Sequence, residues 1–451
     1  MGSNALSRGL WLAPLAFFQL YLLGSVVLFF WGPWPWQPAH PDALAAYLLL
    51  AQAAMAAGYF WSWDRVQGVE PVRASPDAPQ GFLRAAAFVT LLLVVPTSLS
   101  RTGLPIPDVI AGITNAGEVY NQNFERLAGG NPYVAVEYVR ILLAPLLVGL
   151  LPLTIVYWGT LSTALRIACL AGCAFHLAMY IATGTNKGIA DFAVTAPWLV
   201  WLGIRTGTLK AIVSRRTVLL AIGLVFALFL AFFGAGQAQR EGGVGELGVF
   251  NTGSELIYAR RDEGLSLHLG EAQRIIWESL TRYLGQGYYA TSLTMDIDHE
   301  STLGAGHSMF LARNADALFN TDFFTQRSLP GLLEEVHGWP MQGLWHSIYP
   351  WLASDVGFGG TLLVLAAFGW LLGLAWGRAL QGAGPAWVVL AWLMLVLFYY
   401  VPANNQVFQT AETCAAFFIL AISVLLTTRE RVGRPGQAPL ADAQGPPHPA
   451  C

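Results

Sequence analysis

Apolar stretches about 20 residues long alternate with polar segments along most of the chain, and that length suffices for a helix to cross a membrane. The pattern fits ten stretches, at about residues 10–31, 43–63, 82–100, 136–157, 162–183, 189–204, 217–236, 359–379, 386–402 and 409–427. The sixth and the ninth are short, so their ends are the least defined. The alternation predicts an all-α polytopic membrane protein with about ten transmembrane helices.

One long polar block, from Gln237 to Gly360, interrupts the alternation between the seventh and eighth stretches. It contains five histidines and seven arginines, namely His268, His299, His307, His337, His346, Arg240, Arg260, Arg261, Arg274, Arg282, Arg313 and Arg327. The block has no apolar core that would form helices matching the flanking spans. We therefore expect a large extracytoplasmic cap of loops and helices, where a rigid scaffold presents functional residues.

The same alternation divides the chain into four parts. Residues 1–236 hold spans one to seven and an outer segment at 101–138. Residues 237–358 form the cap, and residues 359–428 hold spans eight to ten. Residues 429–451 are rich in Pro, Gly and Ala and are expected to be a disordered cytoplasmic tail.

Basic residues in short loops predict the orientation, because cytoplasmic loops are enriched in Lys and Arg. The segments 64–81, 205–216 and the tail from residue 429 carry such residues, whereas the connection between the first two spans has none. Both termini are therefore expected in the cytoplasm. The polar block is then extracytoplasmic, in the periplasm if the chain lies in the inner membrane of a Gram-negative cell.

Three further segments are expected on the outer face. Residues 101–138 include an amphipathic stretch at 108–124 that predicts an interfacial helix. A turn is predicted at 183–191, and the segment 399–412 contains Asn404 and Asn405 at the outer end of the ninth span. Such amides are costly in lipid. They suit a hydroxyl-rich ligand, or they terminate the broken end of the span.

Composition supports the membrane assignment and limits the partners. Apolar residues make up 55% of the chain and charged residues 11%, whereas soluble domains contain about a quarter charged residues. The net charge of −3 gives no reason to expect nucleic acid as a partner. No aspartate-rich cation motif, Walker loop or HExxH sequence occurs, so neither a metal nor a cofactor is expected.

Cations near the outer ends of the spans are the first candidates for chemistry, because ionisable groups inside a membrane are costly and mark functional sites. Arg140 lies near the start of the fourth span, one turn after Glu137, and Lys187 lies one turn before Asp191. Each pair could equally neutralise itself as an i, i+3 or i, i+4 contact. Lys187 is favoured as a phosphate ligand because its glycine-containing turn exposes backbone N–H groups.

Three more arginines join the list of candidate ligands. Arg274 and Arg282 are eight residues apart, so on a helix they share a similar face. Arg101 and Arg274 each precede a glycine by eleven positions, a spacing often described for polysaccharide polymerases. In a chain with so many Arg and Gly residues, this spacing carries little weight alone.

Histidines supply the candidate general bases, since neutral imidazole takes protons near pH 7. His346 lies just before the eighth span, His307 lies in the loop GAGHSMF, and Glu300 is a carboxylate alternative. Any of these could also be a surface residue without a catalytic role. His176 follows Cys169 and Cys173 at helical spacing, which is more typical of packing than of a metal site.

Several of these motifs together resemble the O-antigen polymerases and ligases. The sequence GTNKGIADF at 184–192 resembles their turn of small residues followed by a cation, with Lys187 where Arg is usual. YLGQGYYATSL, GAGHSMF and SIYPWLASDVGFGG resemble oligosaccharide repeat-unit polymerases of the Wzy type. The resemblance covers about residues 180–410, and it adds Tyr288 and Tyr349 to the candidate glycan-binding residues. His346 also matches the histidine of the related ligase motif.

The resemblance implies a metal-independent membrane glycosyltransferase of the GT-C type. Its substrates would be oligosaccharides linked to undecaprenyl diphosphate, held by Lys187, Arg101, Arg140, Arg274 and Arg282, with membrane lipid and a chain-length regulator protein as partners. The alternatives are an O-antigen ligase that transfers glycan to lipid A core, and a flippase or other transporter of lipid-linked oligosaccharide. A transporter is expected to show broken or charged spans near the middle of the membrane.

Overall fold

The computed structural model describes residues 6–68, 75, 77–128, 130–210, 215–241 and 248–432 of the 451-residue chain. Most of these residues are helical, as predicted. The strands among them are β1 (Val249–Asn251) and β2 (Leu256–Tyr258), which pair in an antiparallel hairpin. The tail was predicted from residue 429, and its first four residues are the end of the helix that runs to Val432. Residues 433–451 of the predicted tail, and residues 242–247 of the predicted cap, lie outside the described residues.

The helices that run along the bundle are α1 (Arg8–Trp31), α2 (Pro41–Trp61), α4 (Ala78–Leu92), α5 (Val94–Thr102), α8 (Val134–Leu142), α9 (Ala144–Tyr157), α10 (Thr163–Ala182), α11 (Lys187–Thr206), α12 (Arg215–Glu241), α17 (Ile348–Leu380), α18 (Pro385–Tyr400) and α20 (Ala411–Val432). The remaining helices are α3 (Trp63–Gln67), α6 (Val109–Thr114), α7 (Ala116–Ala128), η1 (Trp158–Thr160), η2 (Gly264–His268), α13 (Glu271–Thr294), α14 (Met309–Phe319), α15 (Phe323–Gln326), α16 (Leu329–His337) and α19 (Gln406–Gln409).

A helix, or a pair of helices, covers each of the ten stretches predicted as spans. In the described part of the chain, four helices are long and apolar enough to cross a membrane: α1, α2 with α3, α10 and α17. The count rises to six if each of two bent helix pairs is one span. These helices indicate a membrane protein, and the full count of ten spans stays a prediction.

Two of the predicted spans are sharply bent. The axes of α4 and α5 meet at 53° and those of α8 and α9 at 63°. The bends fall at Leu93 and Leu143, which separate the helices of each pair. The segments beyond the bends, α5 and α8, carry Arg101 and Arg140. The bends therefore direct both arginines away from the straight course of a spanning helix.

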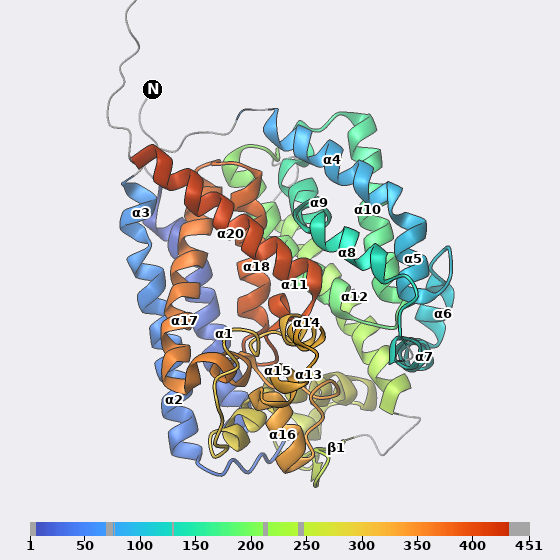
Figure 1. Cartoon of the computed structure of the whole chain (residues 1–451), viewed down its shortest axis with the longest axis vertical. Helices are drawn as coiled ribbons and strands as arrows, with labels where there is room; N and C mark the ends of the chain where they lie inside the picture. The colour runs from blue at the N-terminus through green and yellow to red at the C-terminus, as the bar shows by residue number, and fades with distance from the viewer. Residues whose placement is uncertain are drawn as a thin grey trace, which may run out of the picture.

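Close backbone packing joins the first part of the bundle to the last. A Cβ atom at Gly58 of α2 would lie 1.8 Å from the Ala366 carbonyl oxygen, and one at Gly369 of α17 would lie 2.0 Å from the Met55 oxygen. Only glycine permits this approach, and small residues at such contacts are typical of helices that associate in membranes. The helices α2 and α17 run side by side in Figure 1.

The elements between α12 and α17 gather at one end of the bundle, together with the 32–40 connection between α1 and α2 (Figure 1). We call this the outer end, because these segments are the ones predicted to be extracytoplasmic. The N-terminal end of α1 and the C-terminal end of α20 lie at the opposite end. The elements between α12 and α17 thus form one group at one end of the bundle, and their role as an extracytoplasmic cap stays a prediction.

Two details of the outer end differ from the expectation. The polar block does form a long helix of its own, α13 with 24 residues, because its small and polar side chains, among them Thr281, Thr291 and Ser292, are buried against neighbouring segments. The predicted interfacial helix is two helices, α6 and α7, separated at Asn115. Hydropathy missed α13 because its buried face is polar.

The eighth predicted span begins earlier than its apolar stretch. Helix α17 starts at Ile348, eleven residues before the predicted start at 359, and it is interrupted at Gly357, where φ is 68° and ψ is 167°. A left-handed φ is readily adopted by glycine alone. The predicted boundary between cap and span therefore lies close to a real break in the helix.

Candidate functional site

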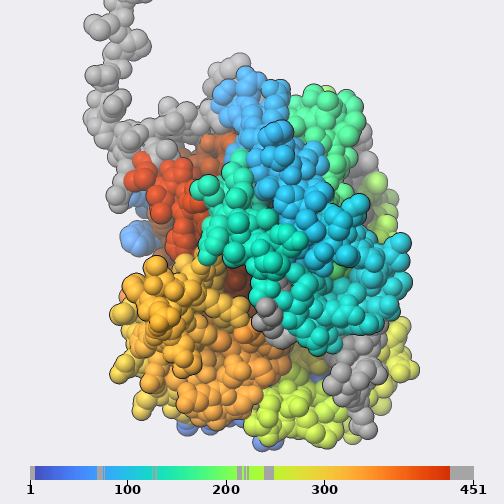
Figure 2. Space-filling view, turned by 45° about the vertical axis from the view of Figure 1, so that its right-hand side comes forward, coloured from blue at the N-terminus to red at the C-terminus, as the bar shows by residue number. Residues whose placement is uncertain are grey.

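A cavity of about 630 Å³ lies among the bent helices and α7, α10, α11, α14, α18 and α20. Figure 2 shows a hollow between the teal surface of the α7–α8 region and the orange surface of the outer end, with red atoms of the C-terminal part of the chain inside it. The residues that line the cavity come from segments between Thr90 and Thr413. Three of the predicted cations, Arg101, Arg140 and Lys187, line it together.

Glu412, at the start of α20, binds two of these cations. Its Oε1 atom accepts hydrogen bonds from Arg101 Nη2 at 2.6 Å and from Arg140 Nε at 2.8 Å, and Arg140 Nη2 lies 2.7 Å away. Arg140 and Glu412 are 6% and 8% exposed. One carboxylate oxygen therefore occupies the point on which two guanidinium groups converge.

Glu137 forms a second, longer set of ion pairs with the same arginines, 3.6 Å from Arg101 and 3.7 Å from Arg140. Its Oε1 atom accepts a hydrogen bond of 2.6 Å from Ser100 Oγ, which in turn accepts one from Asn131. The predicted contact between Glu137 and Arg140 is therefore present. It is part of a larger network rather than an isolated neutral pair.

Lys187 contacts Asp191 as predicted, with Nζ 2.5 Å from Oδ2. Its ammonium group also lies 5.9 Å from the centre of the Tyr400 ring. Lys187 and Asp191 line the cavity beside Tyr180 and Thr185. The turn before α11 thus brings a third cation to the cavity from a different part of the chain.

Apolar side chains form one part of the cavity wall, beside polar Thr, Asn and Tyr side chains. Leu93, Leu147, Leu151, Phe175 and Trp392 line it, and their bodies lie in the membrane-spanning part of the bundle. His176 lines the wall as well, with its ring 5.2 Å from that of Tyr180 in an edge-to-face contact. The cavity therefore joins a charged region to an apolar wall.

The charges of the cavity nearly balance. Arg101, Arg140, Lys187 and Arg313 give four positive charges, and Glu137, Asp191 and Glu412 give three negative charges. Arg313, on α14, is exposed and forms no ion pair within the described part of the chain. An anion that enters the cavity would therefore meet one cation without a carboxylate and three that are shared with carboxylates.

A histidine–aspartate pair lies at the start of α14. His307 Nδ1 is 2.8 Å from Asp355 Oδ2, and the Asp355 side chain is 7% exposed. The same carboxylate accepts hydrogen bonds from the backbone N–H groups of Gly304, Gly306 and His307, each at 3.0 Å, and from Thr302 Oγ1 at 2.6 Å. The Asp355 carboxylate accepts all of these hydrogen bonds, so it accepts from His307 Nδ1 as well. Nδ1 of His307 therefore carries the proton, and the lone pair of Nε2 is left to accept one.

His346 has a different environment. It is 1% exposed, and its ring contacts those of Trp339 and Trp351 at centroid distances of 6.4 and 5.9 Å. Burial lowers the pKa of His346 to about 3. A histidine with that pKa is a weak base, and His346 does not line the cavity.

The other candidate residues at the outer end lie outside the large cavity. Tyr288 and Tyr349 are buried at the outer end, where Tyr288 Oη lies 2.8 Å from Ser25 Oγ. Arg282 lies over the rings of Phe250 and Trp34 at 5.6 and 6.0 Å. Neither these residues nor Arg274 nor Glu300 lines the large cavity.

The amides after the ninth span connect the outer loop to the bundle. Asn405 Nδ2 donates to the His307 carbonyl oxygen at 2.7 Å, while its own backbone N–H donates to Asn404 Oδ1. Gln409 Oε1 accepts from the Met309 backbone N–H. These bonds hold the start of α14 against the segment that leads to Glu412.

The sequence analysis assigned no role to Glu412, Asp355 or Arg313. Glu412 had a usable signal, since it is an acidic residue at the start of an apolar stretch. No described group of three or more His, Cys, Asp and Glu residues could hold a metal ion. Comparisons with protein-family models, curated protein sequences and solved structures found no match for this chain.

Proposed function

We propose that this protein is a membrane glycosyltransferase that polymerises oligosaccharide repeat units linked to undecaprenyl diphosphate. The observation that carries the proposal is the cavity in which Arg101, Arg140, Lys187 and Arg313 lie beside an apolar wall. A lipid diphosphate has the same division into a charged head and an apolar chain. The cations stabilise the negative charge that develops on the leaving diphosphate.

The reaction needs one bond to form and one to break. A hydroxyl of the acceptor repeat unit attacks the anomeric carbon of the growing glycan. The bond from that carbon to the diphosphate oxygen breaks, and its electron pair leaves with undecaprenyl diphosphate. A base takes the hydroxyl proton, and the phosphate charge requires cations but no metal.

His307 is the base that the geometry supports best among the three candidates from the sequence. Asp355 fixes its orientation and leaves Nε2 available, an arrangement used by general bases in other enzymes. His307 does not itself line the cavity, but α14 begins two residues after it, at Met309, and carries Arg313, which does line the cavity. His307 and the cavity therefore belong to the same region of the molecule.

The proposed location follows from the distribution of basic residues. The segments 205–216 and 429–434 carry Lys and Arg and are assigned to the cytoplasm with both termini. The outer end then faces the periplasm in the inner membrane of a Gram-negative cell. A chain-length regulator protein is the expected partner on that side.

Two alternatives use the same cavity. An O-antigen ligase would carry out the same chemistry with lipid A core as the acceptor. A transporter of lipid-linked oligosaccharide is favoured by one specific observation, the bends of 53° and 63° in helix pairs that line the cavity. Broken helices mark the substrate sites of many transporters.

Purified protein in liposomes with an undecaprenyl-diphosphate-linked oligosaccharide tests the proposal. A ladder of longer lipid-linked glycans supports polymerisation. Transfer only when lipid A core is added supports the ligase. Movement of the unaltered glycan to the other leaflet, without a ladder, supports the transporter and contradicts the enzyme.

A further inference from the structure

His176 lines the large cavity but has no part in its ion pairs or in the proposed reaction. It lies on α10, where Cys173, His176, Tyr180 and Thr183 line the cavity at the spacing of one helical face. Neither ring nitrogen of His176 forms a hydrogen bond with a described residue, and neither is among the buried polar atoms that lack a partner. Both nitrogens are therefore open to a ligand in the cavity.

The ring of His176 lies between the apolar and the charged parts of the cavity. One turn earlier on α10, a Cβ atom at Gly172 would lie 2.7 Å from Leu150 Cδ2 and 3.4 Å from Thr90 Cγ2. One turn later, Tyr180 interacts electrostatically with Arg101 and Lys187. His176 itself interacts with Arg140 and Arg101 in the same way. An anion held by these cations would therefore lie beside the imidazole.

The charges that face His176 come from five helices. The cations are Arg101 on α5, Arg140 on α8, Lys187 on α11 and Arg313 on α14, and the carboxylates are Glu137 on α8, Asp191 on α11 and Glu412 on α20. The other titratable lining residues are Tyr120, Cys173 and Tyr180, whereas α4, α6 and α9 contribute none. With a neutral His176, the empty cavity thus has one positive charge in excess.

An anion with two charges reverses this balance. A diphosphate diester carries two negative charges, so the occupied cavity would have one negative charge in excess. An uncompensated charge in a poorly hydrated space is costly. An imidazole, with an ordinary pKa of about 6.5, supplies the missing positive charge when it binds one proton.

We infer that His176 takes up a proton when a diphosphate binds in the cavity, and that the imidazolium donates a hydrogen bond to a phosphate oxygen. The proton comes from the solvent, and the N–H bond is the one covalent bond that forms. His176 is then a binding residue, and His307 remains the proposed base. The choice of a diphosphate rests on the proposed function, whereas the open histidine and the balance of charges do not.

Calorimetric titration of the full-length protein in lipid nanodiscs with dimethyl diphosphate tests this inference without turnover. The probe is the symmetrical diester, so it lacks the titratable proton of a phosphate monoester, whose second pKa is about 6. Titrations at pH 7 in two buffers of different ionisation enthalpy give the number of protons taken up. At least about half a proton should be taken up per bound anion, and the affinity should then fall by about threefold to tenfold between pH 7 and pH 8.

Two variants of His176 separate the charge from the proton. His176→Gln should abolish the proton uptake and should weaken binding at least threefold at pH 7. His176→Lys brings a positive charge of its own, so it should bind the probe at least as tightly as the unmodified protein but without proton uptake. Thermal unfolding of both variants checks that they are folded.

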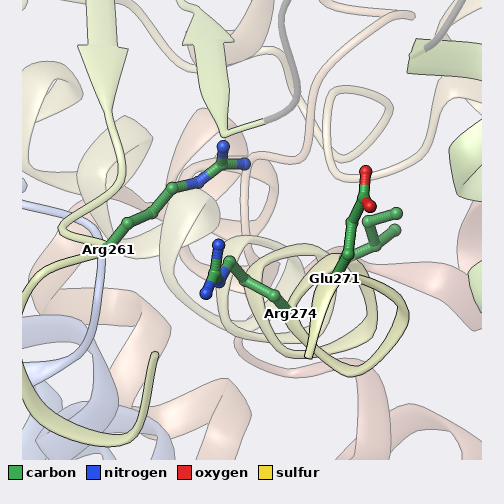
Figure 3. A pocket seen from close by; sticks show the side chains of 4 residues that line it. Arg261, Glu271 and Arg274 are labelled. Carbon is green, nitrogen blue, oxygen red and sulfur yellow. The ribbon is translucent and has the colours of Figure 1, made fainter. Parts of the chain in front are cut away.

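The matched controls are His268→Gln, at an exposed position of the outer end, and Arg274→Gln. Arg274 lines a separate cavity of about 180 Å³, which shares no lining residue with the large one. Figure 3 shows Arg274 and Arg261 on one side of this smaller cavity and Glu271 on the other. Both control variants should take up protons as the unmodified protein does.

Proton uptake that persists in His176→Gln, or that is absent from the unmodified protein, would overturn the inference. An equal loss of uptake in either control variant would overturn it as well. Proton-linked binding of the probe by a protein that makes no glycan ladder would contradict the proposed function and leave this inference in place. A ladder without proton uptake would do the opposite.

Discussion

Arg140 and Glu412 are 272 positions apart in the chain, yet Arg140 donates a 2.8 Å hydrogen bond from Nε to Glu412 Oε1. Its Nη2 atom contacts the same oxygen at 2.7 Å, and Arg101 donates to it as well. Under the proposed function, Glu412 occupies the position that a phosphate oxygen would take between the two arginines. A bound diphosphate must displace this carboxylate or share the arginines with it.

Glu412→Gln should raise the affinity of the cavity for an anion, since it removes the competing charge. We expect pyrophosphate to bind at least tenfold more tightly, because a charge-assisted contact contributes about 1.5–3 kcal/mol. The protein should also unfold at a lower temperature, since the buried Arg140 and the partly buried Arg101 keep carboxylate contacts only to Glu137, at 3.7 and 3.6 Å. Calorimetric titration and thermal unfolding measure both effects. Glu335→Gln, at an exposed position, is the control, and weaker pyrophosphate binding in Glu412→Gln would contradict the competition.

If the proposed function holds, replacement of Arg101, Arg140 or Lys187 by Ala should reduce chain extension at least tenfold, because each would remove a charge-assisted contact to the leaving diphosphate. Lys187→Arg should retain more activity than Lys187→Ala. Glycan ladders on gels, normalised to the amount of protein in the membrane, provide the measurement. Lys210→Ala, in the predicted cytoplasmic segment, should have no effect, and normal ladders from all three Ala variants would disprove the diphosphate role.

Asp355→Asn should lower turnover by about a hundredfold to ten-thousandfold, the usual contribution of a general base. An amide at this position can donate to His307 Nδ1 and leaves the proton on Nε2, the wrong tautomer for a base. His307→Ala should give a similar loss and should remove the acid limb of the pH–rate profile. Asp296→Asn, at an exposed site, serves as the control. An unchanged pH–rate profile in His307→Ala would assign the base elsewhere.

His346 should make the stability of the protein depend on pH. Its pKa is about 3 in the folded state and about 6.5 in an unfolded chain. The unfolded state therefore binds more protons below pH 6.5, and stability falls by up to about 1.4 kcal/mol per pH unit as the pH drops toward 3. Unfolding in detergent at several pH values should show this slope, and His346→Phe should reduce it. A loss of turnover of a hundredfold in a well-folded His346→Phe variant would instead identify His346 as the base.

Cysteine labelling should establish the orientation. In a chain without its native cysteines, a membrane-impermeant reagent added from outside should label cysteines at Ser254 and Asn320, both exposed at the outer end. A cysteine at Lys210 should react only after the membrane is opened. The reverse result would invert the topology and would place the outer end in the cytoplasm.

The helical part of the fold was predictable because the apolar stretches have the length of membrane-spanning helices. A helix or a pair of helices covers every predicted stretch. The bends at Leu93 and Leu143 had a local signal, because Pro96 and Pro145 follow them closely and a proline removes a helical hydrogen bond. The sequence does not give the angle of each bend, which tertiary packing sets. The length of α13 was not predicted. Its buried face is polar, so a hydropathy pattern describes it as a loop.

The candidate site was predictable in part. Ionisable residues at the ends of apolar stretches pointed to Arg140 and Lys187, and the structure brings both to the cavity with Arg101. The sequence contained no information on which of the other cations would join them. Arg274 and Arg282 share a helix but lie in different surroundings, and Arg313 reaches the cavity from a loop-connected helix. Such groupings depend on contacts between distant segments.

The interruption of α17 at Gly357 ties the loop that contains His299 to this helix. A helix that ends leaves its last carbonyl groups without internal partners, and here the oxygens of Ala353, Ser354 and Asp355 accept hydrogen bonds from His299, Thr302 and Ser301. The Asp355 side chain binds the backbone of the same loop. The loop and the membrane helix therefore form one cooperative unit. A loop transplanted without its helix would lose every one of these acceptors, so the two are expected to be inherited, exchanged and unfolded together.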